Sequence, residues 1–266
     1  MGRADAALVE RLGRLIAAFP RNRPPLIAIV GAQGSGKTTL ARAAAEQFAA
    51  VQISLDDVYL TRAERRVMAR EVHPLFVTRG PPGTHDLALL QQVIVALSAA
   101  GPDDATRIPE FDKRGDDRRP QEDWRVFRGR PSAFLIDAWC LGALPQDPAA
   151  LVEPVNALEA DLDPDGGWRR AVNGFVGGAY ADFIARFDAV LFLRAPSFDV
   201  VLDWRSQQEA DLLGVAPADL GAAERERLAG FLRYFERITR HMLDGGVKAD
   251  VVVQLDRNRL PGSMDA

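Results

Sequence analysis

The chain contains little of several residue types that would point to particular classes of protein. It has one cysteine, Cys140, among 266 residues, so a framework of internal disulfides is excluded. Its 33 lysines and arginines do not outnumber its 37 acidic residues, and the net charge of −4 offers no basic surface for nucleic acid. No uncharged apolar run approaches the roughly 20 residues of a membrane span. We therefore expect a cytoplasmic protein that binds neither nucleic acid nor a membrane.

Histidine is scarce as well, which bears on zinc. The three histidines, His73, His85 and His241, lie far apart in the sequence and match no spacing of a zinc site, so none is predicted. With 47% hydrophobic residues, the chain can still build one large core. Nothing in the sequence indicates its oligomeric state.

What the chain does contain is a phosphate-binding motif. Residues 31–38 match the pattern G-x-x-x-x-G-K-[ST], between an apolar run at 26–30 and a helical pattern at 39–48. Glycines let backbone amides approach phosphate oxygens, the lysine places a charge on them, and the threonine can bind Mg²⁺. The predicted nucleotide-binding residues are Gly31, Ala32, Gln33, Gly34, Ser35, Gly36, Lys37, Thr38 and Thr39.

Short apolar runs alternate with helical patterns along the rest of the chain. Strands are predicted at 51–55, 133–136, 189–193 and 251–253, and helices at 4–18, 62–71, 86–99, 148–162, 168–186, 197–213 and 222–243. Buried strands separated by helices are typical of a parallel sheet covered on both faces. The sequence therefore predicts a three-layer α/β fold with a mostly parallel sheet.

We expect residues 1–266 to form a single domain with helical excursions. An N-terminal helix falls within 1–22, a densely charged excursion covers 105–131, and a helical lid region covers 197–243. Thr84 is the predicted N-cap of the helix that begins near residue 86.

Acidic residues at strand ends are candidates for catalysis, because ligands of such sheets bind beyond the carboxyl ends of the strands. Asp56 follows the second strand and could accept the proton of a hydroxyl that attacks a γ-phosphate. Adjacent strand residues point to opposite sides, so we expect Asp56 rather than Asp57 to face the phosphates. Asp137 ends the third strand, as a Mg²⁺-organising acid does. Ala138 follows it, where many hydrolytic ATPases have a glutamate, which favours transfer to an acceptor other than water.

The residues themselves leave the role of three polar segments open. Residues 79–86 combine a Gly/Pro turn with ionisable groups, which suits either an anionic substrate or an ordinary loop. The charged run at 111–114 suits either a substrate-binding segment or a solvated loop. Arg205 would either close over the phosphates or lie on a helix surface.

Taken in order, these motifs resemble the glycerate kinase family of P-loop kinases, which is related to uridine kinase, phosphoribulokinase and bacterial pantothenate kinase. The matching segments are GAQGSGKTTL at 31–40, SLDDVYLT at 54–61, RGPPGTHD at 79–86, PEFDKRGDDR at 109–118, FLIDAWCLG at 134–142 and WRSQQE at 204–209. The third and fourth are far more specific than the phosphate loop. The family usually has Glu and Gly where this chain has Asp137 and Ala138.

The resemblance implies a phosphotransferase with an alcohol group as acceptor, which uses ATP and Mg²⁺ to phosphorylate D-glycerate. It implies catalysis by Lys37 and Asp56, Mg²⁺ held by Thr38 and Asp137, and a lid that Arg205 closes over the nucleotide. The implied pocket for the small hydroxylated substrate is formed by Arg79, His85, Asp86, Asp112 and Lys113. A kinase for a nucleoside or a pantothenate-like acceptor remains an alternative, as does a nucleotide-dependent regulator without transfer activity.

Overall fold

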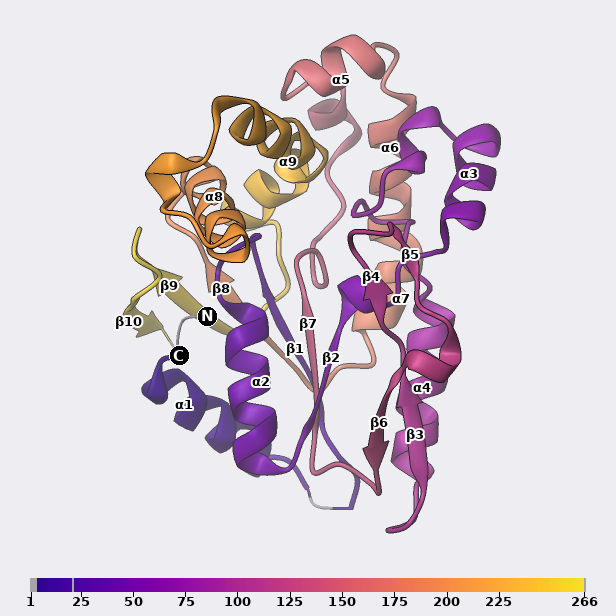
Figure 1. The fold of residues 1–266 in the computed structure, drawn as a ribbon, viewed down its shortest axis with the longest axis vertical. Helices are drawn as coiled ribbons and strands as arrows, with labels where there is room; N and C mark the ends of the chain where they lie inside the picture. Colours follow the sequence, from indigo (N-terminus) through magenta and orange to yellow (C-terminus); the bar gives the residue numbers. More distant parts are fainter. Residues whose placement is uncertain (1–3, 21, 266) are drawn as a thin grey trace.

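A six-stranded sheet occupies the centre of the molecule (Figure 1). The computed structural model describes residues 4–20 and 22–265, with the side chains of 263–265 excepted. The strands are β1 (Leu26–Gly31), β2 (Val51–Ser54), β7 (Phe134–Ala138), β8 (Ala189–Arg194), β9 (Val251–Leu255) and β10 (Pro261–Asp265). Their order is β10-β9-β8-β1-β7-β2, and every neighbouring pair is parallel except β9 and β10. The predicted α/β fold with a mostly parallel sheet is therefore confirmed.

The helices lie around this sheet. They are α1 (Ala6–Ala17), α2 (Lys37–Phe48), α3 (Arg62–Glu71), α4 (Leu87–Ala99), α5 (Ala157–Leu162), α6 (Gly167–Phe175), α7 (Ala181–Ile184), α8 (Asp199–Leu213) and α9 (Ala222–Leu243). Helix α2 packs on α1 and on strands β1, β2 and β7. The helix predicted within 1–22 is α1, while residues 1–3 and 21 lie outside the described residues. None of the helices described is long and apolar enough to cross a membrane.

A single hydrophobic cluster extends from Leu8 in α1 to Leu255 in β9. The strands owe their continuous apolar sequences to burial on both faces of the sheet. Ile27, Ile29 and Leu135 have no exposed surface, and each contributes about 1.5–3 kcal/mol relative to an exposed side chain. This core holds the carboxyl ends of β1, β2 and β7 side by side, and that edge carries the motifs identified in the sequence.

The charged excursion at 105–131 contains strands of its own. β3 (Ala105–Ile108) pairs antiparallel with β6 (Arg125–Arg128), and β4 (Phe111–Asp112) pairs with β5 (Asp117–Arg118). Figure 1 shows this part of the chain beside β2, the edge strand of the main sheet. The excursion therefore covers an edge whose backbone groups would otherwise lack partners.

Two predicted helices are interrupted. Residues 148–151 form only a 3₁₀ turn, and α5 begins at Ala157, because Pro154 cannot continue a helix. The helix predicted at 168–186 changes at Val176–Tyr180 into a π-helical turn in which Gly178 has φ −108° and ψ −106°. Adjacent glycines at this point weaken the helical preference. β10 was not predicted, because residues 261–265 contain no apolar run.

The predicted cap of α4 was wrong. Asp86 is the N-cap, and its carboxylate accepts a hydrogen bond from the Leu89 amide at 2.9 Å. Thr84 closes the preceding turn instead: its hydroxyl accepts from the Gly80 amide at 3.0 Å and donates to the Pro81 carbonyl at 2.7 Å. The short side chain of a threonine can serve either role, and the turn offered it nearer partners.

Candidate active site

The phosphate loop joins β1 to α2 and has the conformation that its glycines allow. Gly34 and Gly36 have φ of 78° and 88°, in the left-handed region that favours glycine. A Cβ on Gly34 would lie 2.7 Å from the Cβ of Trp204 in α8, so the loop and this helix need a glycine here. The close packing joins α8 directly to the phosphate loop.

Several polar groups of the loop are directed at no protein partner. The amide of Gln33 and the hydroxyl of Ser35 are buried and make no hydrogen bond with a described residue. Lys37 donates to the Ala32 carbonyl at 3.3 Å. Burial lowers the pKa of Lys37, and this effect outweighs the negative charges of Asp56 and Asp137, which raise it. Buried polar groups ordinarily find partners. The unpartnered groups and the lysine therefore fit a loop that binds the phosphates of a nucleotide.

The candidate metal ligands meet where α2 begins beside β7. Thr38 Oγ1 donates to Asp137 Oδ2 at 2.7 Å, and the Asp137 side chain is almost fully buried. Two residues of β2 orient the same carboxylate: Gln52 Nε2 donates to Oδ1 at 2.6 Å and Ser54 Oγ donates to Oδ2 at 3.1 Å. A hydroxyl and an oriented carboxylate are the oxygen ligands that suit Mg²⁺, so the donor set fits this ion.

Sequence reasoning missed Gln52 and Ser54. They alternate along a strand whose other residues are apolar, and their side chains lie on the same face of the sheet as that of Asp137, with which Ser54 is in register. Polar residues at positions i and i+2 of a buried strand were the signal that could have revealed them.

Asp56 lies in a 3₁₀ turn directly after β2. Tyr59 Oη donates to its Oδ1 at 2.7 Å, and Lys113 Nζ lies 3.3 Å from its Oδ2. Burial would raise the pKa of Asp56, but Lys113, Lys37 and the Tyr59 hydrogen bond outweigh it and hold this pKa well below its ordinary value. The carboxylate is therefore charged at neutral pH and close to the lysine of the phosphate loop.

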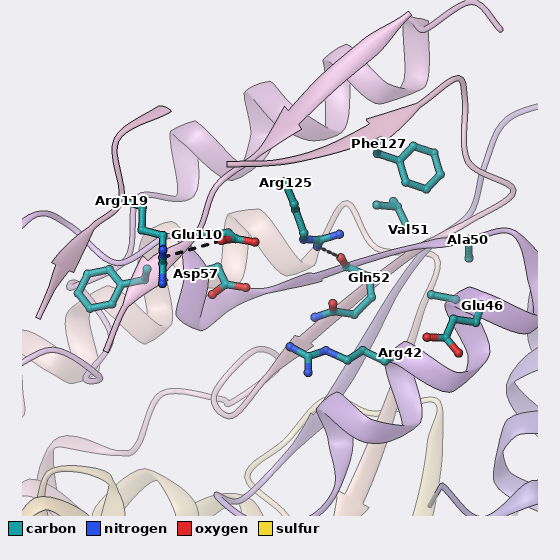
Figure 2. A pocket seen from close by; sticks show the side chains of 12 residues that line it. Arg42, Glu46, Ala50, Val51, Gln52, Asp57, Glu110, Arg119, Arg125 and Phe127 are labelled. Atoms are coloured by element: carbon teal, nitrogen blue, oxygen red, sulfur yellow. Dashed lines mark hydrogen bonds and ion pairs between the residues drawn. The ribbon is translucent and has the colours of Figure 1, made fainter. Parts of the chain in front are cut away.

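Asp57 has a different environment from its neighbour. It lines a separate pocket along β2 (Figure 2) and makes no hydrogen bond or ion pair with a residue that the structure describes. Burial raises the pKa of Asp57 to about 6, and the charges of Asp137 and Asp56 act in the same direction against Lys113 and Arg125. The two adjacent aspartates thus differ in both position and acidity.

His85 lies beside Asp56 in a stack of aromatic rings. Its imidazole stacks on Tyr59 with centroids 4.5 Å apart, and its Nδ1 is 2.6 Å from Tyr180 Oη, which also accepts from the Gly83 amide. Burial raises the pKa of Tyr180 far above its ordinary value and lowers that of His85 to about 4. A neutral imidazole that accepts the tyrosine proton at Nδ1 carries its own hydrogen on Nε2. That nitrogen is buried without a partner among the described residues.

The other residues predicted for the substrate pocket hold the excursion in place. Arg79 binds Asp116 and the Lys113 carbonyl (3.2 Å), and its guanidinium lies over the ring of Phe111. The Asp86 carboxylate that caps α4 also pairs with an excursion arginine at 3.2 Å.

Asp112 closes a local turn. Its carboxylate accepts the amide of Arg114 at 3.0 Å. The structure thus brings His85 and Lys113 to Asp56, whereas Arg79, Asp86 and Asp112 are engaged in contacts of their own.

Arg205 lies in α8, where it binds Gln208 and Glu209, and its charge acts on both Lys37 and Asp56. Arg259, near the C-terminus, was missed by sequence reasoning. It adopts φ 66°, and its Nε donates to the Gly34 carbonyl at 2.7 Å. No local motif marks this arginine, because its partner lies 225 residues away.

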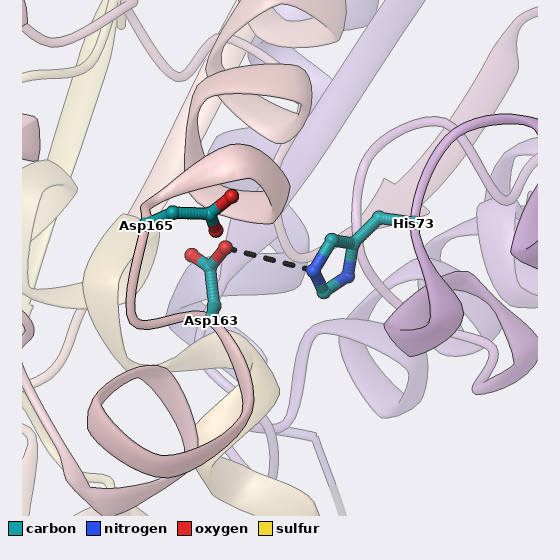
Figure 3. Close-up of side chains that lie close together, drawn as sticks. All are labelled: His73, Asp163 and Asp165. Carbon is teal, nitrogen blue, oxygen red and sulfur yellow. Dashed lines mark ion pairs between the residues drawn. The ribbon is translucent and has the colours of Figure 1, made fainter.

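A second group of ionisable side chains, His73, Asp163 and Asp165, lies outside this site (Figure 3). The Asp163 carboxylate accepts a hydrogen bond from the Trp168 amide at 2.7 Å. It also forms a buried ion pair with Arg169 at 3.2 Å. His73 Nδ1 accepts the amide of Leu75 at 3.3 Å, and its Nε2 lies 3.7 Å from Asp163 Oδ1. These groups already bond one another and the backbone, and they connect the segments that contain them.

Comparison with known proteins places this site in a family. No protein-family model matches the chain. The chain is 33% identical over 202 residues to "Uncharacterized kinase mug58" of Schizosaccharomyces pombe, which covers 71% of this chain and 72% of that protein. It belongs to a family of P-loop kinases. This kinase is also 26% identical over 274 residues to "Probable ATP-dependent kinase TDA10" of Saccharomyces cerevisiae, over 90% of the chain and 87% of the relative.

Solved structures share the fold of this kinase. The YGR205w protein superposes with a TM-score of 0.71 at 23% identity and covers 98% of both chains. A D-glycerate 3-kinase from Cryptococcus neoformans superposes with a TM-score of 0.74 at 19% identity, over 98% of this chain and 97% of that one. The chain is thus a member of a family of ATP-dependent kinases with a P-loop fold.

Proposed function

We propose that this kinase transfers the γ-phosphate of ATP to a hydroxyl group of D-glycerate. The observation that carries the proposal is the position of Asp56. It lies at the carboxyl end of β2, charged at neutral pH, within the electrostatic reach of Lys37 in the phosphate loop. An ionised carboxylate beside the phosphates can accept the proton of an attacking hydroxyl.

In this proposal each residue of the site has one task. Lys37 and the loop amides hold the phosphates of ATP and stabilise the charge that develops on them. Thr38 and Asp137 would hold Mg²⁺, which neutralises phosphate charge when bound. Asp56 takes the hydroxyl proton, while Tyr59 and Lys113 keep its carboxylate ionised and oriented.

Two observations support transfer to a small acid. Ala138 leaves no carboxylate next to Asp137 to activate water, which disfavours simple hydrolysis. Lys113 extends its ammonium group to Asp56 at the surface of the site, so a positive charge is available to an anionic acceptor. The motifs that resemble the glycerate kinase family, together with the fold shared with a D-glycerate 3-kinase, support D-glycerate as the acceptor.

The test is ADP release measured with D-glycerate, uridine, pantothenate and ribulose 5-phosphate as acceptors. We expect D-glycerate to give the highest kcat/KM, with Mg²⁺ required and with Lys37→Ala as the inactive control. A preference for uridine or pantothenate would refute D-glycerate as the acceptor but would still show that the protein is a small-molecule kinase. ATP binding without ADP release for any acceptor would support a nucleotide-dependent regulator and refute the proposal.

A further inference from the structure

A cavity away from the phosphate loop lies among the described residues, and no residue of the phosphate loop lines it. It has a volume of about 570 Å³ and lies between α2, the edge strand β2 and the excursion (Figure 2). We call it the β2-edge pocket. Val51, Phe111 and Phe127 supply apolar walls, and its volume is in the range of pockets that bind small molecules.

The pocket exists because the excursion does not pair with β2 as a strand. Arg125 of β6 bridges the gap instead and donates to the free backbone carbonyl of Gln52. Gln52 in turn orients Asp137 through its side chain, at 2.6 Å. One side of the pocket is therefore connected through a single residue to the candidate metal ligand.

Two guanidinium groups on this side of the pocket retain free donors. Arg42 of α2 makes no hydrogen bond or ion pair with any residue in the described part of the chain, and Arg125 makes only its bond to Gln52. Burial lowers the pKa of Arg125, and so does the positive charge of Arg42. The negative charges of Asp57 and Glu110 raise this pKa but do not offset the lowering. An oxyanion placed at these arginines would relieve their repulsion and occupy donors that carboxylates and phosphates match well.

Acidic groups line the rest of the pocket. Asp57 has no partner in the described structure, whereas Glu110 lies 3.9 Å from Arg119 and Glu46 is exposed to solvent. An unpartnered carboxylate accepts a hydroxyl hydrogen and repels a second anion. The pocket thus offers donors on one side and an acceptor on the other.

We propose that the β2-edge pocket binds a small hydroxylated organic anion, a carboxylate or a phosphate ester, with its oxyanion on Arg42 and Arg125 and a hydroxyl on Asp57. The site is separate from the phosphate loop. The chemistry is shared by the acceptor of the kinase and by any similar metabolite that binds without reacting. The proposal does not depend on which acceptor the kinase uses.

Isothermal titration calorimetry of the full chain with inorganic phosphate tests the site, after the phosphate loop has been saturated with Mg²⁺ and a non-hydrolysable ATP analogue. We expect saturable binding, weakened on the order of tenfold or more in Arg42→Gln, the loss expected for one charge-assisted hydrogen-bonding group. Arg66→Gln, which removes the same charge from an exposed position of α3, is the matched control and should bind like wild type. Arg125→Gln should weaken binding too, provided that its circular dichroism spectrum shows a folded chain.

Competition with D-glycerate then identifies the source of the ligand. Displacement of phosphate assigns the pocket to the acceptor, and unchanged phosphate binding assigns it to a separate metabolite; either result keeps the site. Absence of saturable binding to the wild type, or equal binding by Arg42→Gln and Arg66→Gln, overturns it. Because phosphate binding is measured without turnover, this result is independent of whether D-glycerate supports ADP release.

Discussion

Asp56 and Asp57 provide a matched pair of substitutions, because the two neighbours share a turn but differ in their surroundings. Asp56→Asn removes the carboxylate that Tyr59 and Lys113 hold in place, whereas Asp57→Asn changes a group without a hydrogen-bond partner among the described residues. If Asp56 is the base, its loss should lower kcat by about 10²–10⁴-fold. Asp57→Asn should change kcat by no more than about fivefold, since Asp57 lines the β2-edge pocket and its partly screened charge acts on Asp56 only at a distance.

The pH dependence of the wild type separates the same two residues without a mutation. A base must be deprotonated to act, so activity is lost as the pH falls through its pKa. The pKa of Asp56 is held well below its ordinary value, so its titration should leave kcat/KM constant down to at least pH 5. The pKa of Asp57 is about 6, so a base at Asp57 would make kcat/KM fall about tenfold per pH unit below pH 6.

Steady-state kinetics from pH 5 to 8.5 with both variants provide the assay, with ATP binding measured separately to exclude misfolded protein. An acidic limb near pH 6 that disappears in Asp57→Asn, together with a mild effect of Asp56→Asn, would refute our assignment of the base.

Three further substitutions test the site and its support. Lys37→Ala should lower kcat by about 10²-fold or more while the thermal midpoint stays close to that of the wild type; near-normal turnover by the folded variant would contradict its role. Tyr180→Phe leaves the Gly83 amide and His85 Nδ1 without a partner and should cost about 1–3 kcal/mol in urea unfolding; unchanged stability would show that these bonds are weak. Arg79→Lys weakens the contacts with Asp116 and the Lys113 carbonyl that hold the excursion, so it should raise KM for an acid acceptor through displacement of Lys113, but not KM for ATP; equal effects on both constants would show a general disturbance.

Local sequence patterns predicted the sheet and the phosphate loop, because continuous burial imposes apolar runs and the loop needs its glycines. The acids at strand ends were also found, since strand ends are marked by a change from apolar to polar residues. Asp137 lies in contact with Thr38, as the motif requires.

Other features depend on partners that are distant in the sequence. Arg79 was predicted to face a substrate, yet its guanidinium binds Asp116, 37 residues further on. Tyr180 reaches His85 from a π-helical turn that interrupts a predicted helix. The β2-edge pocket arises where the excursion meets β2, so no single segment indicates it.

The most direct test of the account is the stoichiometry of phosphate transfer. ³¹P NMR of the kinase with ATP, Mg²⁺ and D-glycerate should show a new phosphomonoester that accumulates in the same amount as ADP, with no excess of inorganic phosphate. ADP formed together with inorganic phosphate and without a phosphomonoester, or no reaction at all, would contradict transfer to D-glycerate.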